Sequence, residues 1–412
     1  MSVIILLFSA KILKISDTAK LWIYNSIYYI LFRLINNYVM SEKKEGLLIP
    51  GVSLKEEILE IVNKELGLNE STKAETHLVC CPSRERVKNS NKKWKVFLAG
   101  PIQGAPAWQH SINKIKNVIF YSPRRKSYSN FNYKEQTEWE RDYMNYADVI
   151  LFWIPEEIEH VEGRSYAQTT RTEFGEYLAL GKKIIFGCYN DFPGKRYFAS
   201  KLEEYGVDSK IHSSLDECLA ELKNYIKDCE KNPQTWFTSD THFSDPRAWE
   251  LSRRPFKSVE EMDKVLIRNW NDNVKPCDTI YHLGDFAKDP KNVIPWLNGN
   301  IILIYGNYER DGKYEVDDSM FKKVFKESAI VTIGDKKYGL CHEPLRGKAL
   351  MSRHPDLYGV MFGHIHGRSK VKRFNAVDVG VDGWFYKPMS IDDCNFFINA
   401  VRKGYYDKEV WC

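Results

Sequence analysis

Five short segments in the second half of the chain each place a polar residue of the metal-binding type directly after a predicted strand. The segments are Asp240-Thr241-His242, Gly284-Asp285, Gly306-Asn307, His342 and Gly363-His364-Ile365-His366. Carboxylate, amide and imidazole groups in this mixture suit two divalent ions about 3.5 to 4 Å apart, with one carboxylate bridging them. A fold that binds such a pair of ions has to bring the ends of these strands to one place.

The strands expected in this half of the chain are short and rich in β-branched or aromatic residues. They are Thr235–Ser239, Thr279–Leu283, Ile301–Tyr305, Ile330–Ile333, Tyr338–Cys341, Val360–Phe362 and Ala376–Val381. Residues 235–390 resemble the calcineurin-like metallophosphoesterase family in the order of the five segments and in the runs from Trp236 to His242 and from Tyr281 to Phe286. The resemblance implies an α+β fold, a sandwich of two sheets flanked by helices.

The resemblance also implies a role for each candidate ligand. Asp240, His242 and His366 would hold the first metal, Asn307, His342 and His364 the second, and Asp285 would bridge them. We expect two divalent ions, manganese first, with iron, nickel or zinc as alternatives. Such a pair lowers the pKa of a shared water and stabilises the charge of an in-line displacement at phosphorus. The alternative is that these histidines are ordinary core or surface residues.

One segment departs from the family pattern. Where the family has Gly-Asn-His-Asp, with the histidine protonating the leaving oxygen, this chain has Gly306-Asn307-Tyr308-Glu309. Tyr308 can donate a proton, but its ordinary pKa near 10 matches neutral pH less well than that of imidazole. We therefore expect activity that is slow or limited to substrates with good leaving groups.

The first half of the chain alternates predicted strands and helices from residue 94 onward. Strands are expected at Lys95–Ala99, Val118–Tyr121, Asp148–Ile154 and Lys183–Cys188, and helices at Trp108–Asn117, Glu138–Tyr146, Thr172–Leu180 and Leu215–Cys229. This alternation predicts βαβ units and an α/β, Rossmann-like parallel sheet. A ligand of such a sheet lies beyond the carboxyl ends of the strands.

Three segments of this half resemble the nucleoside 2-deoxyribosyltransferase superfamily and its nucleotide N-hydrolase branch. They are the run from Phe97 to Gly104, the stretch from Trp139-Glu140 to Ala147-Asp148, and Thr172-Glu173-Phe174-Gly175-Glu176. The resemblance implies that Glu173 is the nucleophile, Glu140 the acid or base, and Asp148 a residue that orients sugar or base. It also implies that Gly100, Gln103 and Gly104 pass close to the sugar or a 5′-phosphate.

Two departures affect this second resemblance. Ala167 stands where the transferases often have an acidic residue six positions before the nucleophile, and the loop from Glu156 to Thr170 is long. The alternative interpretation is a Rossmann-like domain that binds a nucleotide without turnover.

Charge and cysteine content restrict the partners and the compartment. The chain has 60 Lys and Arg against 55 Asp and Glu, a net charge of +5, and the basic residues are interspersed with acidic ones. We therefore expect a small nucleotide or phosphoester substrate and no specific nucleic-acid binding. Nine cysteines without a C-x-x-C pair favour a reducing cytosol.

The sequence predicts four regions. Residues 1–39 are a hydrophobic extension, interpreted as an upstream extension of the reading frame with the working start at Met40, or as a membrane-surface anchor. Residues 40–93 carry an amphipathic helix that begins at a capping box from Ser53 to Glu56, followed by a polar linker. The transferase-like domain is expected at 94–231 and the phosphoesterase domain at 232–412.

The expected function is a bifunctional nucleotide enzyme, in which one site hydrolyses a phosphoester and the other cleaves or transfers an N-glycosidic bond. Two alternatives stay open: a phosphoesterase whose middle domain senses a nucleotide, and a binding protein in which both sites have decayed.

Overall fold

The computed structural model describes residues 77–84, 93–128, 131–207 and 210–405, which lie within one compact unit from Ala74 to Cys412. The hydrophobic extension and the helix predicted from Ser53 lie outside the described residues. No helix in the described ranges combines the length and apolarity that a membrane span requires.

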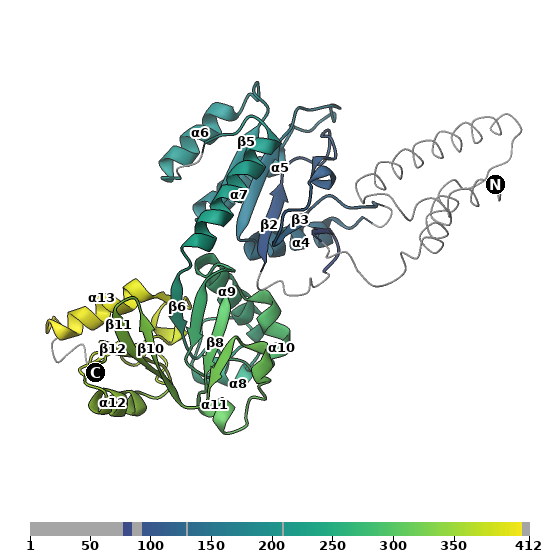
Figure 1. Cartoon of the computed structure of the whole chain (residues 1–412). Helices are drawn as coiled ribbons and strands as arrows, with labels where there is room; N and C mark the ends of the chain where they lie inside the picture. The colour runs from purple at the N-terminus through teal and green to yellow at the C-terminus, as the bar shows by residue number, and fades with distance from the viewer. Residues whose placement is uncertain (1–76, 85–92, 129–130, 208–209, 406–412) are drawn as a thin grey trace, which may run out of the picture. The chain divides into compact units, whose positions relative to one another are not determined.

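The first half contains one sheet of five parallel strands in the order β1-β3-β2-β4-β5 (Figure 1). The strands are β1 (Leu78–Cys80), β2 (Trp94–Ala99), β3 (Val118–Ser122), β4 (Val149–Ile154) and β5 (Ile184–Cys188). This confirms the predicted parallel sheet. Strand β1 lies inside the segment predicted as a linker, and its three residues are too few for a periodic signal.

Helices cover both faces of this sheet. Helices α4 (Tyr133–Tyr146), α5 (Gln168–Ala179) and α6 (Lys195–Glu204) contribute to the core on one face, and α7 (Leu215–Lys231) to the core on the other. Helix α5 begins four residues before its predicted start, which shortens the preceding loop. The helix predicted at Trp108–Asn117 is wrong: only a 3-10 turn, η3 (Trp108–Ser111), forms, and the backbone becomes extended at the buried Ile112.

The second half is a sandwich of two mixed sheets, as the resemblance implied. Their strand orders are β15-β6-β7-β8-β9 and β10-β11-β12-β14-β13. The strands are β6 (Thr235–Thr238), β7 (Thr279–His282), β8 (Asn300–Ile304), β9 (Lys323–Phe325), β10 (Ser328–Ile333), β11 (Lys336–Cys341), β12 (Gly359–Phe362), β13 (Val371–Lys372), β14 (Ala376–Asp378) and β15 (Met389–Ser390).

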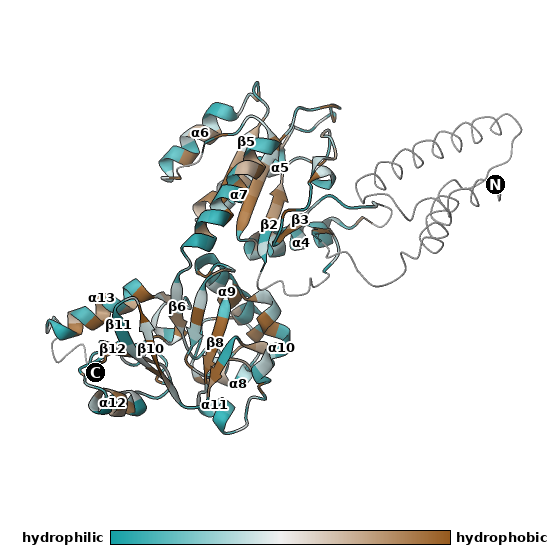
Figure 2. Cartoon of the chain, viewed as in Figure 1, coloured by the Kyte–Doolittle hydropathy of each residue, from teal (hydrophilic) through white to brown (hydrophobic). Residues whose placement is uncertain are grey.

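Apolar side chains of both sheets meet in the middle of the sandwich and helices cover its outer faces. Phe237 and Leu283 from the first sheet and Leu340 and Met361 from the second share one buried cluster. Helix α9 (Val259–Asn273) covers the first sheet and α12 (Pro344–Arg353) the second, while α13 (Ile391–Arg402) packs against the shared cluster. In Figure 2 strand β8 is largely brown, whereas α12 and α13 show both brown and teal residues.

The direction of the strands determines where the ligand-bearing segments go. Strands β6, β7 and β8 are parallel to one another, and so are β11, β12 and β14. A bridge between Ser239 and Gly380 links the ends of β6 and β14 across the two sheets. The five segments that the sequence singled out follow β6, β7, β8, β11 and β12 and therefore meet at one edge of the sandwich.

Candidate active sites

Seven side chains meet where these strands end. They are the predicted ligands Asp240, His242, Asp285, Asn307, His342, His364 and His366. Ligand atoms of Asp240, His242 and His366 all lie within 4.8 Å of one another, and so do those of Asp240, Asp285 and His342. The structure thus brings together every residue that the sequence proposed for the metal pair.

The second group of predicted ligands is equally close. The Oδ1 atom of Asn307 lies 3.0 Å from Nε2 of His342 and 3.1 Å from Nδ1 of His364, and these two ring nitrogens are 3.2 Å apart. Asp285 lies between the groups, because its Oδ2 is 3.3 Å from Nε2 of His342 and 3.6 Å from Nε2 of His242. This is the place that a bridging carboxylate requires.

The tautomer of His242 is determined by a chain of hydrogen bonds. The hydroxyl of Tyr314 donates to Asp245 at 2.7 Å, so it accepts a hydrogen bond from Nδ1 of His242, also at 2.7 Å. The Nε2 atom therefore carries the lone pair, and it is buried without a hydrogen-bond partner among the described residues. Burial also lowers the pKa of His242 to about 4, which keeps the ring neutral.

A divalent cation binds well to a buried, unprotonated nitrogen that lies beside carboxylates. Without a cation the buried nitrogen would have no partner, which costs folding free energy. The donor set of imidazole, carboxylate and amide groups suits manganese, iron, nickel or zinc. The residues present therefore fit a pair of divalent ions.

His366 is oriented in a similar way from the other side. Its Nδ1 donates to Oδ2 of Asp382 at 2.8 Å, and its Nε2 faces Oδ1 of Asp240 at 3.9 Å. Arg254 holds Asp382 with two hydrogen bonds of 2.9 Å and also donates to the main-chain oxygens of Asp240 and Thr241. Arg254 thus links the backbone of one ligand to the carboxylate that orients another.

Glycines allow the ligand loops to approach one another. A β-carbon at Gly306 would collide with the side chain and main chain of Asp285, and one at Gly363 would collide with Ser239 and Asp240. The glycines of the Gly-Asn and Gly-His segments are therefore required by close packing around the ligands.

Five ligands, Asp240, His242, Asp285, His364 and His366, themselves have positive φ angles between 49° and 75°. Such strained backbone is characteristic of functional sites.

Glu309 has a role that differs from that of the family aspartate. Its carboxylate accepts hydrogen bonds from the main-chain N–H groups of Asp285, Phe286 and Gly306 at 2.7 to 2.9 Å. Burial raises the pKa of Glu309, and the charge of Asp285 adds to the effect. Glu309 therefore holds the loop of the bridging carboxylate and does not orient the side chain of Tyr308.

Tyr308 lies at the mouth of this site. Its main-chain N–H donates to Oδ1 of Asp285 at 3.0 Å, and its ring meets that of His242 edge to face, with 4.9 Å between centroids. The side chain is partly exposed. Its hydroxyl accepts a hydrogen bond from Nη1 of Arg247 at 3.1 Å.

Sequence reasoning missed the residues that orient the ligands. Tyr314, Asp245, Asp382 and Arg254 are isolated polar residues outside the five segments. Asp245 does carry one local signal, because it precedes Pro246 and caps helix α8 (Pro246–Leu251). That signal predicts a helix start and gives no hint of a hydrogen bond to Tyr314.

In the transferase-like half, two of the three predicted carboxylates lie within electrostatic range of one another. Burial raises the pKa of Glu173 to about 8, and the negative charges of Glu140 and Glu176 add to the effect. Burial also raises the pKa of Glu140. Glu173 lies in the second turn of α5 and Glu140 in α4, so two elements on one face of the sheet supply this pair of carboxyl groups.

A buried network holds Glu140. Its Oε1 accepts a hydrogen bond from Nε2 of Gln136 at 2.8 Å, while the Oε1 atom of Gln136 accepts from Nε of Arg125 at 2.7 Å and from the thiol of Cys81 at 3.2 Å. Gln136 therefore links the guanidinium of Arg125 to the carboxyl group of Glu140 through two hydrogen bonds. None of these three neighbours was proposed from the sequence.

The structure does not place Asp148 with this pair. Asp148 precedes β4, at the amino edge of the sheet, and it is buried with an exposed fraction of 3%. It accepts hydrogen bonds from the main-chain N–H of Lys95 at 2.7 Å and from Nδ2 of Asn298 at 2.5 Å. The expectation that Asp148 orients sugar or base is wrong, because its oxygens bind groups at the edge opposite to the carboxyl ends of the strands.

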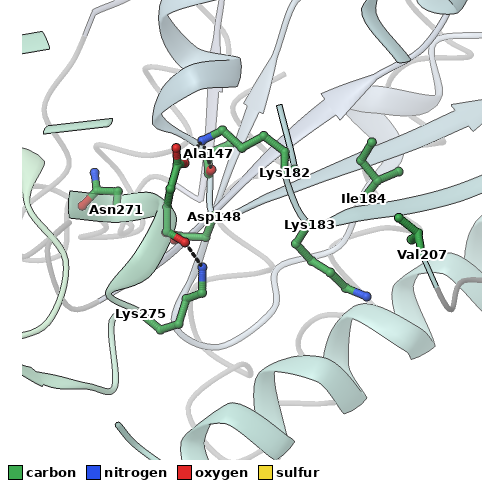
Figure 3. Close-up of a pocket in the computed structure, with 10 residues that line it drawn as sticks. Ala147, Asp148, Lys182, Lys183, Ile184, Val207, Asn271 and Lys275 are labelled. Atoms are coloured by element: carbon green, nitrogen blue, oxygen red, sulfur yellow. Dashed lines mark hydrogen bonds and ion pairs between the residues drawn. The ribbon is translucent and has the colours of Figure 1, made fainter. Parts of the chain in front are cut away.

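A pocket of about 260 Å³ lies at this amino edge. Its lining includes Asp148, Lys182, Lys183, Asp272 and Lys275 (Figure 3). The ammonium group of Lys182 is already engaged, since it lies 2.6 Å from Oδ1 of Asp272 and donates to the main-chain oxygens of Asn145 and Ala147. This pocket contains neither the Glu140 and Glu173 pair nor a predicted metal ligand.

The glycine segment makes close contacts with β4 and with the loop after it. A β-carbon at Gly100 would collide with the main-chain oxygen of Trp153, and one at Gly104 with the main-chain oxygen of Glu159. The side chain of Gln103 accepts a hydrogen bond from Arg164 of the same loop. These contacts explain the glycines by packing alone, so their role toward a sugar or phosphate stays a prediction.

Comparison with known proteins agrees with the two halves. Residues 93–192 match the family described as nucleoside 2-deoxyribosyltransferase like, and residues 235–388 match the calcineurin-like phosphoesterase superfamily domain. Members of the second family use divalent metal ions.

Two curated proteins and two solved structures are similar to parts of the chain. An uncharacterized protein of Methanocaldococcus jannaschii is 30% identical over 183 residues, which are 41% of this chain and 92% of that protein. The Gene 66 protein of Mycobacterium phage L5 is 29% identical over 209 residues, 41% of this chain and 96% of that protein. The solved structures are a protein of unknown function from Aquifex aeolicus and an archaeal phosphodiesterase. The first is 24% identical, and the match covers 40% of this chain and 99% of that one, with a TM-score of 0.34. The second is 20% identical, and the match covers 38% of this chain and 98% of that one, with a TM-score of 0.25.

Proposed function

Because this chain belongs to the calcineurin-like phosphoesterase superfamily through residues 235–388 and carries a nucleoside 2-deoxyribosyltransferase-like domain at residues 93–192, we propose that it is a bifunctional nucleotide enzyme. Its carboxy-terminal site hydrolyses a phosphoester with two divalent ions, manganese first. Its middle domain cleaves or transfers the N-glycosidic bond of a nucleoside or nucleotide.

One observation supports the phosphoesterase most strongly. Asp285 has one oxygen within 3.6 Å of the ring nitrogens of both His242 and His342, which belong to the two ligand groups. A carboxylate that lies between two groups of potential metal ligands is the arrangement of a dinuclear centre. Among the described residues it is unlike a surface cluster of acids, because both histidines and Asp285 are buried.

The residues of the chain have separate tasks in this reaction. The ions, when bound, supply positive charge to the phosphoryl oxygens and to the attacking water. Tyr314 and Asp382 keep a lone pair of His242 and His366 directed at the centre. Glu309 fixes the loop that carries Asp285. Rigid ligands need little reorganisation during the reaction, which is the basis of electrostatic stabilisation.

The second activity is supported by the pair Glu140 and Glu173. A nucleophilic Glu173 would bond to the anomeric carbon while the base departs with the electrons of the C–N bond and a proton from an acid, and water or an acceptor would then release the sugar. The nucleophile role requires that Glu173 be ionised when it attacks, and Glu140, whose charge acts on Glu173, is the candidate that supplies a proton to the departing base. The alternative is a middle domain that binds a nucleotide without turnover.

The compartment and partners are part of the same proposal. The eight cysteines in the described ranges are free thiols, which agrees with a reducing cytosol. We expect a small nucleotide or phosphoester as the substrate and no specific nucleic acid. Membrane attachment through residues 1–39 is the alternative that the sequence leaves open.

A panel of nucleosides, nucleotides and phosphodiesters tests the proposal. Phosphate or nucleotide release should require Mn²⁺ and stop in excess chelator, while release of free base should continue in chelator. Glu173→Ala should abolish base release and leave metal-dependent hydrolysis intact. Nucleotide binding without base release from any member of the panel would support the sensing alternative for the middle domain, and hydrolysis that ignores the chelator would contradict the metal centre.

A further inference from the structure

Tyr308 stands where the family has a histidine, and the structure surrounds it with positive charge. Nη1 of Arg247 donates to its hydroxyl at 3.1 Å, and Nζ of Lys313 lies 4.8 Å from the centre of its ring. The ring contacts His242, and the main-chain N–H is bound to Asp285. Tyr308 is thus fixed beside one metal ligand and the bridging carboxylate.

Arg247 is anchored to the same hydrogen-bonded chain that orients His242. Its main-chain N–H donates at 2.9 Å to Asp245, the residue that also accepts from Tyr314. Its side chain is exposed, and no carboxylate among the described residues pairs with it. A guanidinium has five N–H donors, so the bond to Tyr308 leaves others available at the mouth of the site.

The direction of this hydrogen bond defines what Tyr308 can do. Because its oxygen accepts from Arg247, its single proton stays available for another acceptor. A tyrosine hydroxyl and a guanidinium are both hydrogen-bond donors, and the guanidinium also carries a fixed positive charge. Tyr308 and Arg247 together are therefore suited to stabilise an oxyanion by hydrogen bonds and charge.

We propose that Arg247 and Tyr308 form a leaving-group subsite for phosphoesters whose leaving oxygen is acidic, an aryl or a phosphoryl oxygen. This inference rests on the proposed phosphoesterase function. Water bonds to phosphorus, the bond from phosphorus to the leaving oxygen breaks, and both electrons go to that oxygen. The leaving group departs as an anion held by Tyr308 and Arg247, and the proton of the water goes to solvent.

A series of aryl and alkyl phosphate esters tests this assignment. With saturating Mn²⁺, kcat/KM of the wild type should fall steeply as the pKa of the leaving alcohol rises. Arg247→Met should lose roughly 100- to 1000-fold toward aryl esters, the size expected for one donor to a developing oxyanion. Arg353→Met, an exposed arginine at the end of α12, is the matched control and should keep wild-type rates.

Tyr308→His supplies the opposite change. It should make the rate depend less on the leaving group and raise hydrolysis of alkyl esters, because an imidazole can transfer a proton to the leaving oxygen. Metal content and melting temperature of each variant show whether the site has stayed intact. Nucleoside diphosphates compared with aryl phosphates distinguish phosphoryl from aryl leaving groups.

Three outcomes would count against the subsite. Unchanged kcat/KM in Arg247→Met with full metal content would overturn the role of Arg247. Equal wild-type rates on alkyl and aryl esters would overturn the substrate class. Absence of any metal-dependent hydrolysis by the wild type would instead overturn the proposed phosphoesterase function, and this inference with it.

Discussion

The carboxylate of Asp382 accepts a hydrogen bond from Nδ1 of His366 at 2.8 Å, although Asp382 lies outside every segment that resembles the family motif. The bond leaves the lone pair of His366 on Nε2, toward Asp240. Arg254 holds Asp382 in place with two further hydrogen bonds. The geometry of the first metal position therefore depends on two residues that bind no metal themselves.

Replacing Asp382 should weaken metal binding without removing a ligand. Asp382→Asn loses the negative charge that fixes the tautomer of His366. Replacing a residue that hydrogen-bonds to a metal ligand changes the affinity for the metal by roughly 10- to 100-fold. Titration of metal-free protein with Mn²⁺, followed by calorimetry, measures the change. Asp335→Asn, in an exposed turn of the same domain, should bind as the wild type does. Identical titrations of the two variants would contradict the role of Asp382.

Replacing Glu309 should destabilise the phosphoesterase domain. Its carboxylate accepts three main-chain N–H groups, and Glu309→Gln would bring an amide donor against them. We expect a loss of about 2 to 4 kcal/mol in the free energy of unfolding, measured by urea titration in chelator. The exposed Glu315→Gln is the control. A loss below about 0.5 kcal/mol would show that the three hydrogen bonds to the carboxylate of Glu309 are not important for stability.

Stability should also depend on pH through Glu173. Its pKa in the folded protein, about 8, lies above the ordinary carboxyl value near 4.3. The stability that its bound proton contributes is therefore complete below about pH 4 and is lost as pH rises through about 8. Glu173→Gln cannot ionise, so it should be more stable than the wild type at pH 9, by about 1 to 3 kcal/mol, and similar at pH 4.

Thermal unfolding at the two pH values checks this expectation. Glu203→Gln, on the exposed side of α6, serves as the control and should follow the wild type at both. A Glu173→Gln variant that gains nothing at pH 9 would show that Glu173 is ionised without cost in the folded protein.

The metal ligands could be predicted from the sequence because each follows a short apolar strand in a local motif. Parallel strands bring such motifs to one edge, and the order of the motifs along the chain carries the family resemblance that implied the roles of Asp285 and His342. The hydrogen bonds from His242 to Tyr314 and from His366 to Asp382 join separate segments of the chain, and no local sequence pattern predicts them. Asp148 was misplaced for a related reason, since the spacing from Glu140 does not reveal that α4 carries the chain to the opposite edge of the sheet.

The central claim is that two divalent ions held around Asp285 hydrolyse a phosphoester. Metal content by mass spectrometry and phosphoester hydrolysis should be measured on the same samples of wild type, Asp285→Asn and the control Asp335→Asn. We predict about two ions per chain and Mn²⁺-dependent turnover for the wild type and the control. Asp285→Asn should lose metal and activity together, because the bridging charge holds both ions. Full turnover by Asp285→Asn, or by metal-free wild type, would contradict the account.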